Sequence, residues 1–375
     1  MRILHLDPDD MDNPISGGGP VRTWEICRRL ARRHEVTVLT PTFPGSTPEL
    51  WRDGIRYVRL GRKVRDHGSS HHLTFLASLP WAVRRYPHDL LVEDFMPPCS
   101  ATLTPLFRRR DRPMVGSVQW FSAREYTRWL KLPFHWGEEY GVRLYQNLVV
   151  LTPSMQAFME ERHASVKARV IPNGVDDALF EQPIRAGRGI LFMGRIEVGA
   201  KGVDLLLQAW ARLPEAEREP LTLAGKVQEP EALQRELERT GLVGKVRIYG
   251  IYNAEQRLAL LDECRCLAMP SRYETFGMTI SEANAAGKPV VLWNKQPMSE
   301  VAAPGCPLVP PFDVDAYAAA LRDVQHWSDD DLVARGHAMR EHARRYNWDS
   351  AAAAQEAFYE ELLAASPHGR HLASR

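Results

Sequence analysis

Short apolar runs alternate with amphipathic stretches along almost the whole chain. In the first half, the runs with the length and composition of buried strands are residues 2–6, 35–40, 54–60, 89–93, 114–119 and 148–152. The second half repeats the pattern at residues 190–194, 221–225, 245–250, 266–270 and 289–293, with helix-like segments such as 21–33 and 231–240 between runs. Because nearly continuous apolar strands are typical of sheets buried on both faces, the pattern predicts an α/β protein with parallel sheets covered by helices.

The two halves meet at residues 169–180, where Pro172 and Asn173–Gly174 favour turns. A chain of 375 residues is long for a single core, so two domains are expected. We predict Rossmann-like domains over residues 1–170 and 171–350, with a last helix at about 351–366 packing back on the first domain. Two doubly wound domains that face each other leave a central cleft at the carboxyl ends of their strands, where such folds bind ligands.

Composition and charge indicate a globular protein and argue against a nucleic-acid-binding or membrane-spanning one. The chain is 44% hydrophobic and 25% charged, as globular proteins are, and its formal net charge of +1 gives no electrostatic case for a nucleic-acid partner. It starts MRILHLDP without a signal-peptide pattern, and no apolar stretch approaches the ~20 residues that span a bilayer. We therefore expect a cytoplasmic protein, while the arginines and aromatic residues of the first half leave peripheral membrane contact open.

Cysteines and acidic residues give no metal-binding pattern. The five cysteines are scattered, and the closest two, Cys264 and Cys266, are expected to be buried thiols in a reducing compartment rather than zinc ligands. The acidic positions 7, 9, 10 and 12 are expected to form a solvated loop. The sequence thus predicts neither a metal site nor a bound cofactor.

Two cations follow the first strand of the second half. Gly194 and Arg195 end that run, and Lys201 comes six residues after Arg195. At the carboxyl end of a strand in a nucleotide-type sheet, two such cations suit a diphosphate, and a glycine lets the backbone approach it. Taken alone, the pair fits ordinary surface cations as well.

The segment ETFGMTISE at 274–282 places two glutamates eight positions apart around Gly277. On one continuous helix they would be separated by about 12 Å of rise, so they converge only if Glu274 lies in a turn and Glu282 one turn into a helix. A helix starting at Gly277 would aim its first N–H groups at an anion. Glu282 could then bind a ribose diol and Glu274 the hydroxyls of a second sugar. Alternatives are a carboxylate that favours the helix start, or a pair of glycosidase carboxylates.

These motifs resemble those of the retaining GT-B glycosyltransferases of family 4 (glycosyl transferases group 1). The motifs that carry the resemblance are Gly194–Arg195 with Lys201–Gly202, Pro270–Ser271 followed by Glu274-x7-Glu282, Ile171-Pro-Asn-Gly-Val-Asp176, and Asn347–Trp348. The resemblance covers nearly the full chain. It implies the GT-B fold, and transfer of a sugar from a nucleotide diphosphate-sugar to a hydroxyl acceptor by a metal-independent, front-face mechanism.

The resemblance also implies roles for individual residues. Arg195 and Lys201 would hold the donor diphosphate, Glu274 the donor sugar and Glu282 the ribose, while Ile251 and Tyr252 would lie by the base. The glycine run after the first strand would face the donor phosphates or the acceptor; Arg22 at its third glycine position excludes a dinucleotide fingerprint. The implied catalytic residues are Arg195, Lys201, Glu274 and Gln119, and the implied donor-binding residues are Gly17, Gly18, Gly19, Gly194, Ile251, Tyr252, Phe276, Gly277, Met278, Thr279 and Glu282.

The chain departs from the family pattern in two places. Many members have a histidine where this chain has Gln119, and a glutamine can hydrogen-bond a sugar but cannot move a proton. After residue 293 the chain reads NKQPMSEV, which keeps only Glu300 of a common Gly-Gly-x-x-Glu loop, so the donor sugar is not inferred.

The acceptor is left open among saccharides, natural products and lipid-linked glycans. The segment 120–145 is rich in aromatic and charged residues, and Arg84, Arg85 and 108–110 would suit an anionic lipid carrier or simply a solvated helix end. The competing functions are a sugar-nucleotide epimerase of the same fold and a nucleotide-sugar-binding protein without activity.

Overall fold

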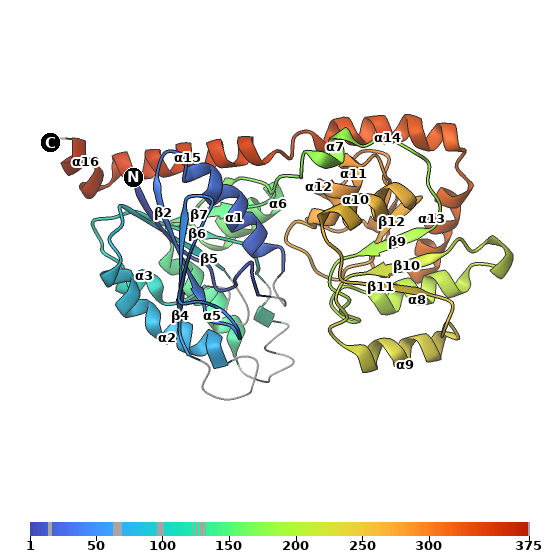
Figure 1. Ribbon diagram of the computed structural model, residues 1–375, viewed down its shortest axis with the longest axis horizontal. Coiled ribbons are helices and arrows are strands. Elements are labelled where there is room, and N and C mark those ends of the chain that lie inside the picture. Colours follow the sequence, from blue (N-terminus) through green and yellow to red (C-terminus); the bar gives the residue numbers. More distant parts are fainter. Residues whose placement is uncertain are drawn as a thin grey trace. The chain divides into compact units, whose positions relative to one another are not determined.

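The computed structural model describes residues 1–13, 17–62, 70–95, 101–121, 123–124, 127, 131 and 133–373. The chain divides into two compact units (Figure 1): Met1–Gly174 with Trp348–Arg375, and Val175–Asn347. The predicted boundary after residue 170 lies four residues before this division. No helix in the described part of the chain is long and apolar enough to cross a membrane.

The first unit contains an eight-stranded sheet in the order β3-β4-β2-β1-β5-β6-β7-β8. Its strands are β1 (Arg2–Leu6), β2 (Glu35–Pro41), β3 (Glu49–Arg52), β4 (Ile55–Leu60), β5 (Leu90–Asp94), β6 (Met114–Ser117), β7 (Asn147–Val150) and β8 (Lys167–Val170). Only β3 is antiparallel to its neighbour, β4. The sequence pattern missed β3 and β8, because both are short edge strands with exposed positions that interrupt any apolar run.

Helices cover this sheet and include the end of the chain. They are α1 (Gly19–Leu30), α2 (Ser70–Arg85), α3 (Thr104–Phe107), α5 (Phe134–Gly141), α6 (Pro153–Arg162), α15 (Trp348–Ala365) and α16 (Pro367–Ala373). Figure 1 shows α15 next to α1, with which it is in contact. The last long helix therefore belongs to the first unit, although the whole second unit lies between it and the rest of the first unit in sequence.

The second unit contains a fully parallel sheet of six strands in the order β11-β10-β9-β12-β13-β14. The strands are β9 (Ile190–Met193), β10 (Leu221–Ala224), β11 (Arg247–Gly250), β12 (Cys266–Met269), β13 (Val290–Trp293) and β14 (Leu308–Val309). The helices are α7 (Ala178–Glu181), α8 (Val203–Arg212), α9 (Pro230–Thr240), α10 (Ala254–Glu263), α11 (Met278–Ala285), α12 (Met298–Val301), α13 (Val314–His326) and α14 (Asp329–Ala343). From β9 the chain adds β10 and β11 on one side, and it then adds β12, β13 and β14 on the other side. The strand order therefore reverses between β9 and β12, and sheets of this kind bind ligands at such a point.

Arg22 on α1 hydrogen-bonds both to α15 and to residues 172–173, at the end of the first stretch of chain in this unit. Its side chain is buried, and it donates to the Pro172 carbonyl at 3.0 Å, Asn173 Oδ1 at 2.9 Å and Gln355 Oε1 at 2.9 Å. Burial lowers the pKa of Arg22 to about 10 despite the nearby charge of Asp94. The arginine at the third glycine position of the N-terminal loop is therefore a structural residue.

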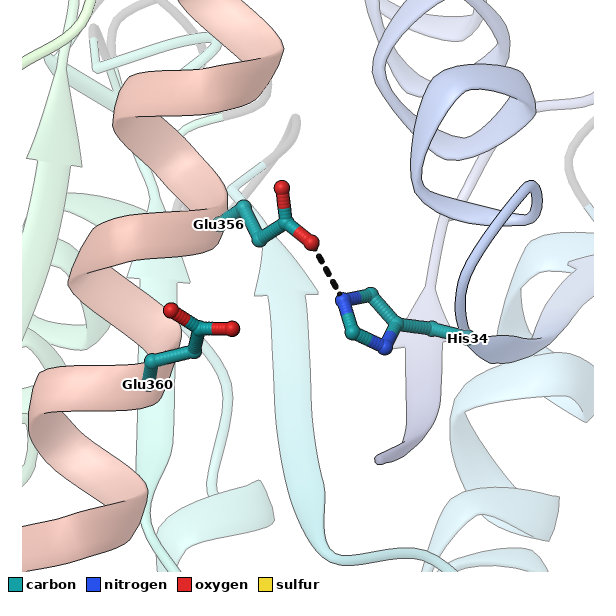
Figure 2. Close-up of side chains that lie close together, drawn as sticks. All are labelled: His34, Glu356 and Glu360. Atoms are coloured by element: carbon teal, nitrogen blue, oxygen red, sulfur yellow. Dashed lines mark hydrogen bonds and ion pairs between the residues drawn. The ribbon is translucent and has the colours of Figure 1, made fainter.

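A second link between α15 and the rest of its unit is drawn in Figure 2. His34 Nε2 lies 2.6 Å from Glu356 Oε1, and the other oxygen of Glu356 pairs with Arg33. Donor atoms of His34, Glu356 and Glu360 come within 4.8 Å of one another, as metal ligands do. Because both oxygens of the Glu356 carboxylate already have partners, His34 and Arg33, we interpret the cluster as a tertiary contact rather than an ion site.

The prediction that the acidic residues at positions 7, 9, 10 and 12 are solvated is wrong for two of the four. Asp7 and Asp10 are 4% and 3% exposed. Asp10 accepts from Arg59 Nε at 2.8 Å and from Thr40 Oγ1 at 2.7 Å, so β2 and β4 supply its partners. The prediction of buried thiols is confirmed for Cys264 and Cys266; Cys27 and Cys306 are buried free thiols as well, and Cys99 lies outside the described residues.

Candidate active site

Arg195 lies directly after β9, at the carboxyl edge of the second sheet. Its side chain is 46% exposed, and Nη1 lies 3.2 Å from Glu197 Oε1. Gly194 has φ 135°, and a Cβ there would meet nothing within 4 Å. The backbone conformation thus requires glycine at 194, and the space beside it is open to a ligand.

Lys201 and Glu274 form an ion pair, although 73 positions separate them. Lys201 Nζ lies 2.6 Å from Glu274 Oε1, and Ser271 Oγ donates to the same oxygen at 2.9 Å. Gly202 makes this possible: its φ is 67°, and a Cβ on it would lie 2.0 Å from the Pro270 carbonyl oxygen. Only glycine lets the loop before α8 approach the end of β12 so closely, and that approach places Lys201 beside Glu274.

Helix α11 begins where the sequence predicts. Gly277 is its N-cap, with φ 81° in the left-handed region, and no side chain caps the helix. The Phe276 side chain is 2% exposed and packs edge-on against Tyr346 at 5.3 Å between ring centres, so only its backbone can face a ligand. Thr279 Oγ1 contacts the Met269 sulfur at 3.6 Å. The helix start therefore offers backbone N–H groups and the positive end of the helix dipole.

Glu282 is buried about one turn into α11 and is held by a partner that the sequence did not reveal. Its Oε1 accepts from Arg257 Nη1 at 2.8 Å, and Arg257 Nη2 donates to Asp176 Oδ2 at 2.6 Å. Burial raises the pKa of Glu282 above its usual value, and the charge of Arg257 opposes that rise. Arg257 lies on α10, in a stretch without a motif, and only its position five residues after Tyr252 could have drawn attention to it.

The residues expected near the base differ in exposure. Ile251 is 69% exposed just after β11. Tyr252 is half-buried, and burial, together with the charge of Glu282, raises the pKa of its hydroxyl. The second unit thus brings Arg195, Lys201, Glu274, Glu282 and Tyr252 to one edge of its sheet.

In the first unit, the glycine run leads into the start of α1, as expected. Gly18 is the N-cap of α1, Gly19 is its first residue, and Gly17 N donates to Asp9 Oδ2 at 3.3 Å. Ser16, which opens the run, lies outside the described residues. Gln119 follows β6, and its Nε2 donates to Ser117 Oγ at 3.0 Å. Both features lie at the carboxyl edge of the first sheet.

A buried polar cluster at the same edge was missed by the sequence analysis. His5 Nε2 on β1 lies 3.2 Å from Asp94 Oδ1 at the end of β5, and Thr23 Oγ1 donates to Asp94 Oδ2 at 2.8 Å. Burial disfavours both charges, but their mutual attraction and hydrogen bonds raise the pKa of His5 and lower that of Asp94. Burial and the charge of Asp94 raise the pKa of Asp7. A histidine within an otherwise apolar strand was the available signal.

Comparison with known proteins identifies the family. Residues 180–345 match the family model described as "Glycosyl transferases group 1", and residues 16–179 match "Glycosyltransferase Family 4". The chain is 30% identical over 268 residues to glycogen synthase from Mycobacterium tuberculosis, a match that covers 66% of this chain and 63% of that protein. It thus spans less than two thirds of that relative.

Two further comparisons extend over almost the whole chain. Phosphatidyl-myo-inositol mannosyltransferase from Mycolicibacterium smegmatis is 32% identical over 392 residues, which cover 97% of this chain and 95% of that protein. The crystal structure of HepE from Anabaena in complex with UDP and glucose matches with a TM-score of 0.73 at 16% identity, over 96% of this chain and 100% of that chain. With its two Rossmann-like units and these matches, the chain belongs to glycosyltransferase family 4 and has the GT-B fold.

Proposed function

We propose that the chain transfers a sugar, with retention of the anomeric configuration, from a nucleoside diphosphate-sugar to a hydroxyl acceptor. The observation that carries the proposal is the arrangement around the start of α11. Lys201 contacts Glu274 before the helix, the uncapped N-terminus follows at Gly277, and Glu282 lies buried about one turn further on. A cation, helix-end N–H groups and two carboxylates suit a diphosphate that lies between a sugar and a ribose.

In this proposal each group of the second unit binds one part of the donor. Glu282 accepts hydrogen bonds from the ribose diol, and Glu274 accepts them from hydroxyls of the sugar being moved. Arg195 and Lys201 hold the diphosphate, and Tyr252 with Ile251 lies by the base. The structural match to HepE, which was crystallised with UDP and glucose, supports a uridine nucleotide as the first donor to test.

The chemistry follows from where negative charge develops. In a front-face reaction the bond from the anomeric carbon to the diphosphate stretches first, and the acceptor hydroxyl attacks from the same side. The departing phosphate oxygen can take the acceptor proton, so no protein nucleophile is required. Arg195, Lys201 and the N–H groups at the start of α11 would stabilise the leaving phosphate, an effect that is usually the largest contribution to catalysis. Because these groups supply the positive charge, we propose a metal-independent reaction.

The acceptor contributes a hydroxyl and, in the proposal, contacts the first unit near Gln119. Saccharides, natural products and lipid-linked glycans all offer such a group. The name of the mycolicibacterial relative supports a lipid-borne acceptor among the first to test.

The test is product stereochemistry. The chain is incubated with UDP-, GDP- and ADP-sugars and a panel of acceptors, and proton NMR reads the anomeric coupling of the product. We expect an α-linked product from an α-linked sugar donor. Arg195→Ala should slow the transfer reaction by two to three orders of magnitude, the usual effect of removing one positioned hydrogen-bond donor. A β-linked product would refute retention. Conversion of the donor sugar without an acceptor would favour an epimerase, and donor binding without turnover would favour an inactive binding protein.

A further inference from the structure

The first unit has an open apolar hollow between α2, α3 and α5. Its volume is about 690 Å³. Carbon-rich side chains from all three helices line it, among them Leu76, Leu103, Leu106, Phe107, Trp136 and Tyr140. We call these residues, together with the arginines described below, the α2–α5 surface. Apolar hollows of this size are typical of sites that bind apolar or amphipathic groups.

Large apolar side chains stand exposed at its edge. The exposed fractions are 57% for Leu103, 60% for Leu106, 58% for Trp136 and 58% for Tyr140. Another large apolar side chain, that of Trp81 on α2, is also 58% exposed. Single exposed apolar residues are ordinary on protein surfaces, but a cluster around a hollow marks an interaction site.

Exposed arginines lie close in sequence to the residues that line the hollow. Each lies within five positions of a lining residue: two follow Pro80, two follow Phe107 and one precedes Leu144. They are Arg84, Arg85, Arg109, Arg110 and Arg143. Nearby exposed acids are Asp111 and Glu139. These five arginines thus outnumber the two exposed acids close to them, whereas the whole chain has a formal charge of only +1.

Two of these arginines stack on exposed aromatic rings: that of Tyr140, which lines the hollow, and that of Trp81, which follows the lining residue Pro80. The Arg85 guanidinium lies 5.3 Å from the centre of the Trp81 ring, and that of Arg143 lies 5.1 Å from the Tyr140 ring. Tryptophan and tyrosine, with an apolar body and a polar edge, are enriched where a membrane meets water, and arginine there keeps its charge in the headgroup layer. Aromatic, aliphatic and cationic groups thus occur together in the combination that an anionic membrane surface binds.

We propose that the α2–α5 surface docks on the headgroup layer of a membrane containing anionic phospholipid. Leu106 and Trp136 enter the boundary between headgroups and acyl chains, and the arginines pair with lipid phosphates. Membrane docking itself does not require that the chain transfers a sugar. Its consequence for function rests on the proposed function: if the chain is a transferase, docking would bring it to acceptors carried by lipids.

The test is co-sedimentation of the full chain with large unilamellar vesicles. Vesicles of phosphatidylglycerol and phosphatidylcholine in equal parts are compared with pure phosphatidylcholine, at 0.1 and 0.5 M NaCl. Each arginine near an anionic surface contributes about a fivefold increase in partition, so Arg84→Ala/Arg85→Ala should weaken binding by about 25-fold. Trp136→Ala should weaken it by about tenfold through lost apolar contact. High salt should lower binding of the unaltered chain as it screens the arginines.

Matched controls lie elsewhere on the chain. Trp51 on β3 is 63% exposed, and the Arg235 side chain on α9 is 69% exposed, so Trp51→Ala and Arg235→Ala should bind vesicles like the unaltered chain. Equal binding to neutral and anionic vesicles, no binding to either, or equal losses in the controls would overturn the proposal. So would a dimer, seen by light scattering, that Trp136→Ala dissociates, because the occupant would then be a second copy. Nucleotide binding, measured in parallel, shows whether the donor site is intact in each variant.

Discussion

Arg257→Met removes the cation that lies between Glu282 and Asp176. Its guanidinium contacts Glu282 at 2.8 Å and Asp176 at 2.6 Å. At an effective dielectric constant of about 20, two unit charges about 4 Å apart attract by about 4 kcal/mol. The Arg257 side chain is 19% exposed and Asp176 is 44% exposed, so solvent screens the second contact strongly. We expect Arg257→Met to lower the free energy of unfolding by about 3 kcal/mol at pH 8.

The same change should make stability and donor binding depend on pH. Burial already raises the pKa of Glu282, and removal of Arg257, whose charge opposes that rise, should raise it further. A carboxyl group whose pKa is higher in the folded state than in the unfolded state stabilises the fold at low pH and loses that contribution as pH rises through the folded pKa. The deficit of the variant should therefore be small near pH 5 and full at pH 8.

Urea unfolding and nucleotide titration at pH 5.5, 6.5 and 8 measure both effects. Protonation of Glu282 in the variant leaves the ribose fewer acceptors, so affinity should fall about tenfold at the lowest pH and recover partly as pH rises. Arg235→Met, on the exposed face of α9, is the matched control and should change neither quantity. A deficit of the same size at every pH, or full stability at pH 8, would refute the role given to Arg257.

Three further predictions concern other parts of the chain. Lys201→Ala and Glu274→Gln should each lower kcat/KM by about 100-fold or more, and the double variant should lose much less than the product, because the two groups act as a pair. Arg22→Met should lower the free energy of unfolding by about 3 kcal/mol in urea, since its buried acceptors lose their donor, while nucleotide affinity stays unchanged. Transfer measured with and without excess EDTA should proceed at the same rate, and loss of activity that Mg²⁺ restores would contradict the metal-independent mechanism.

The parts of the fold that follow a short-range pattern could be predicted from the sequence. Apolar runs located the central strands, and Gly277 between two glutamates located the start of α11, because only a glycine readily takes φ 81°. Edge strands β3 and β8 have exposed positions, so periodicity did not mark them.

Side-chain partners distant in sequence could not be predicted in the same way. Glu282 is 25 positions from Arg257, and His5 is paired with Asp94 from another strand. Such contacts depend on which helix lies beside which strand, and a single sequence has no periodic signal for that. For the same reason Asp10, read as solvated, is buried against Arg59.

The central claim is that the arrangement around α11 binds a nucleoside diphosphate-sugar, and isothermal titration tests it most directly. The chain is titrated with UDP, GDP, ADP and their sugars in the presence of EDTA, alongside Glu282→Gln and the exposed control Glu255→Gln on α10. The account predicts binding of one nucleotide family by the unaltered chain and by Glu255→Gln, with affinity at least tenfold weaker in Glu282→Gln. Equal affinity in all three, or no binding of any nucleotide, would contradict it.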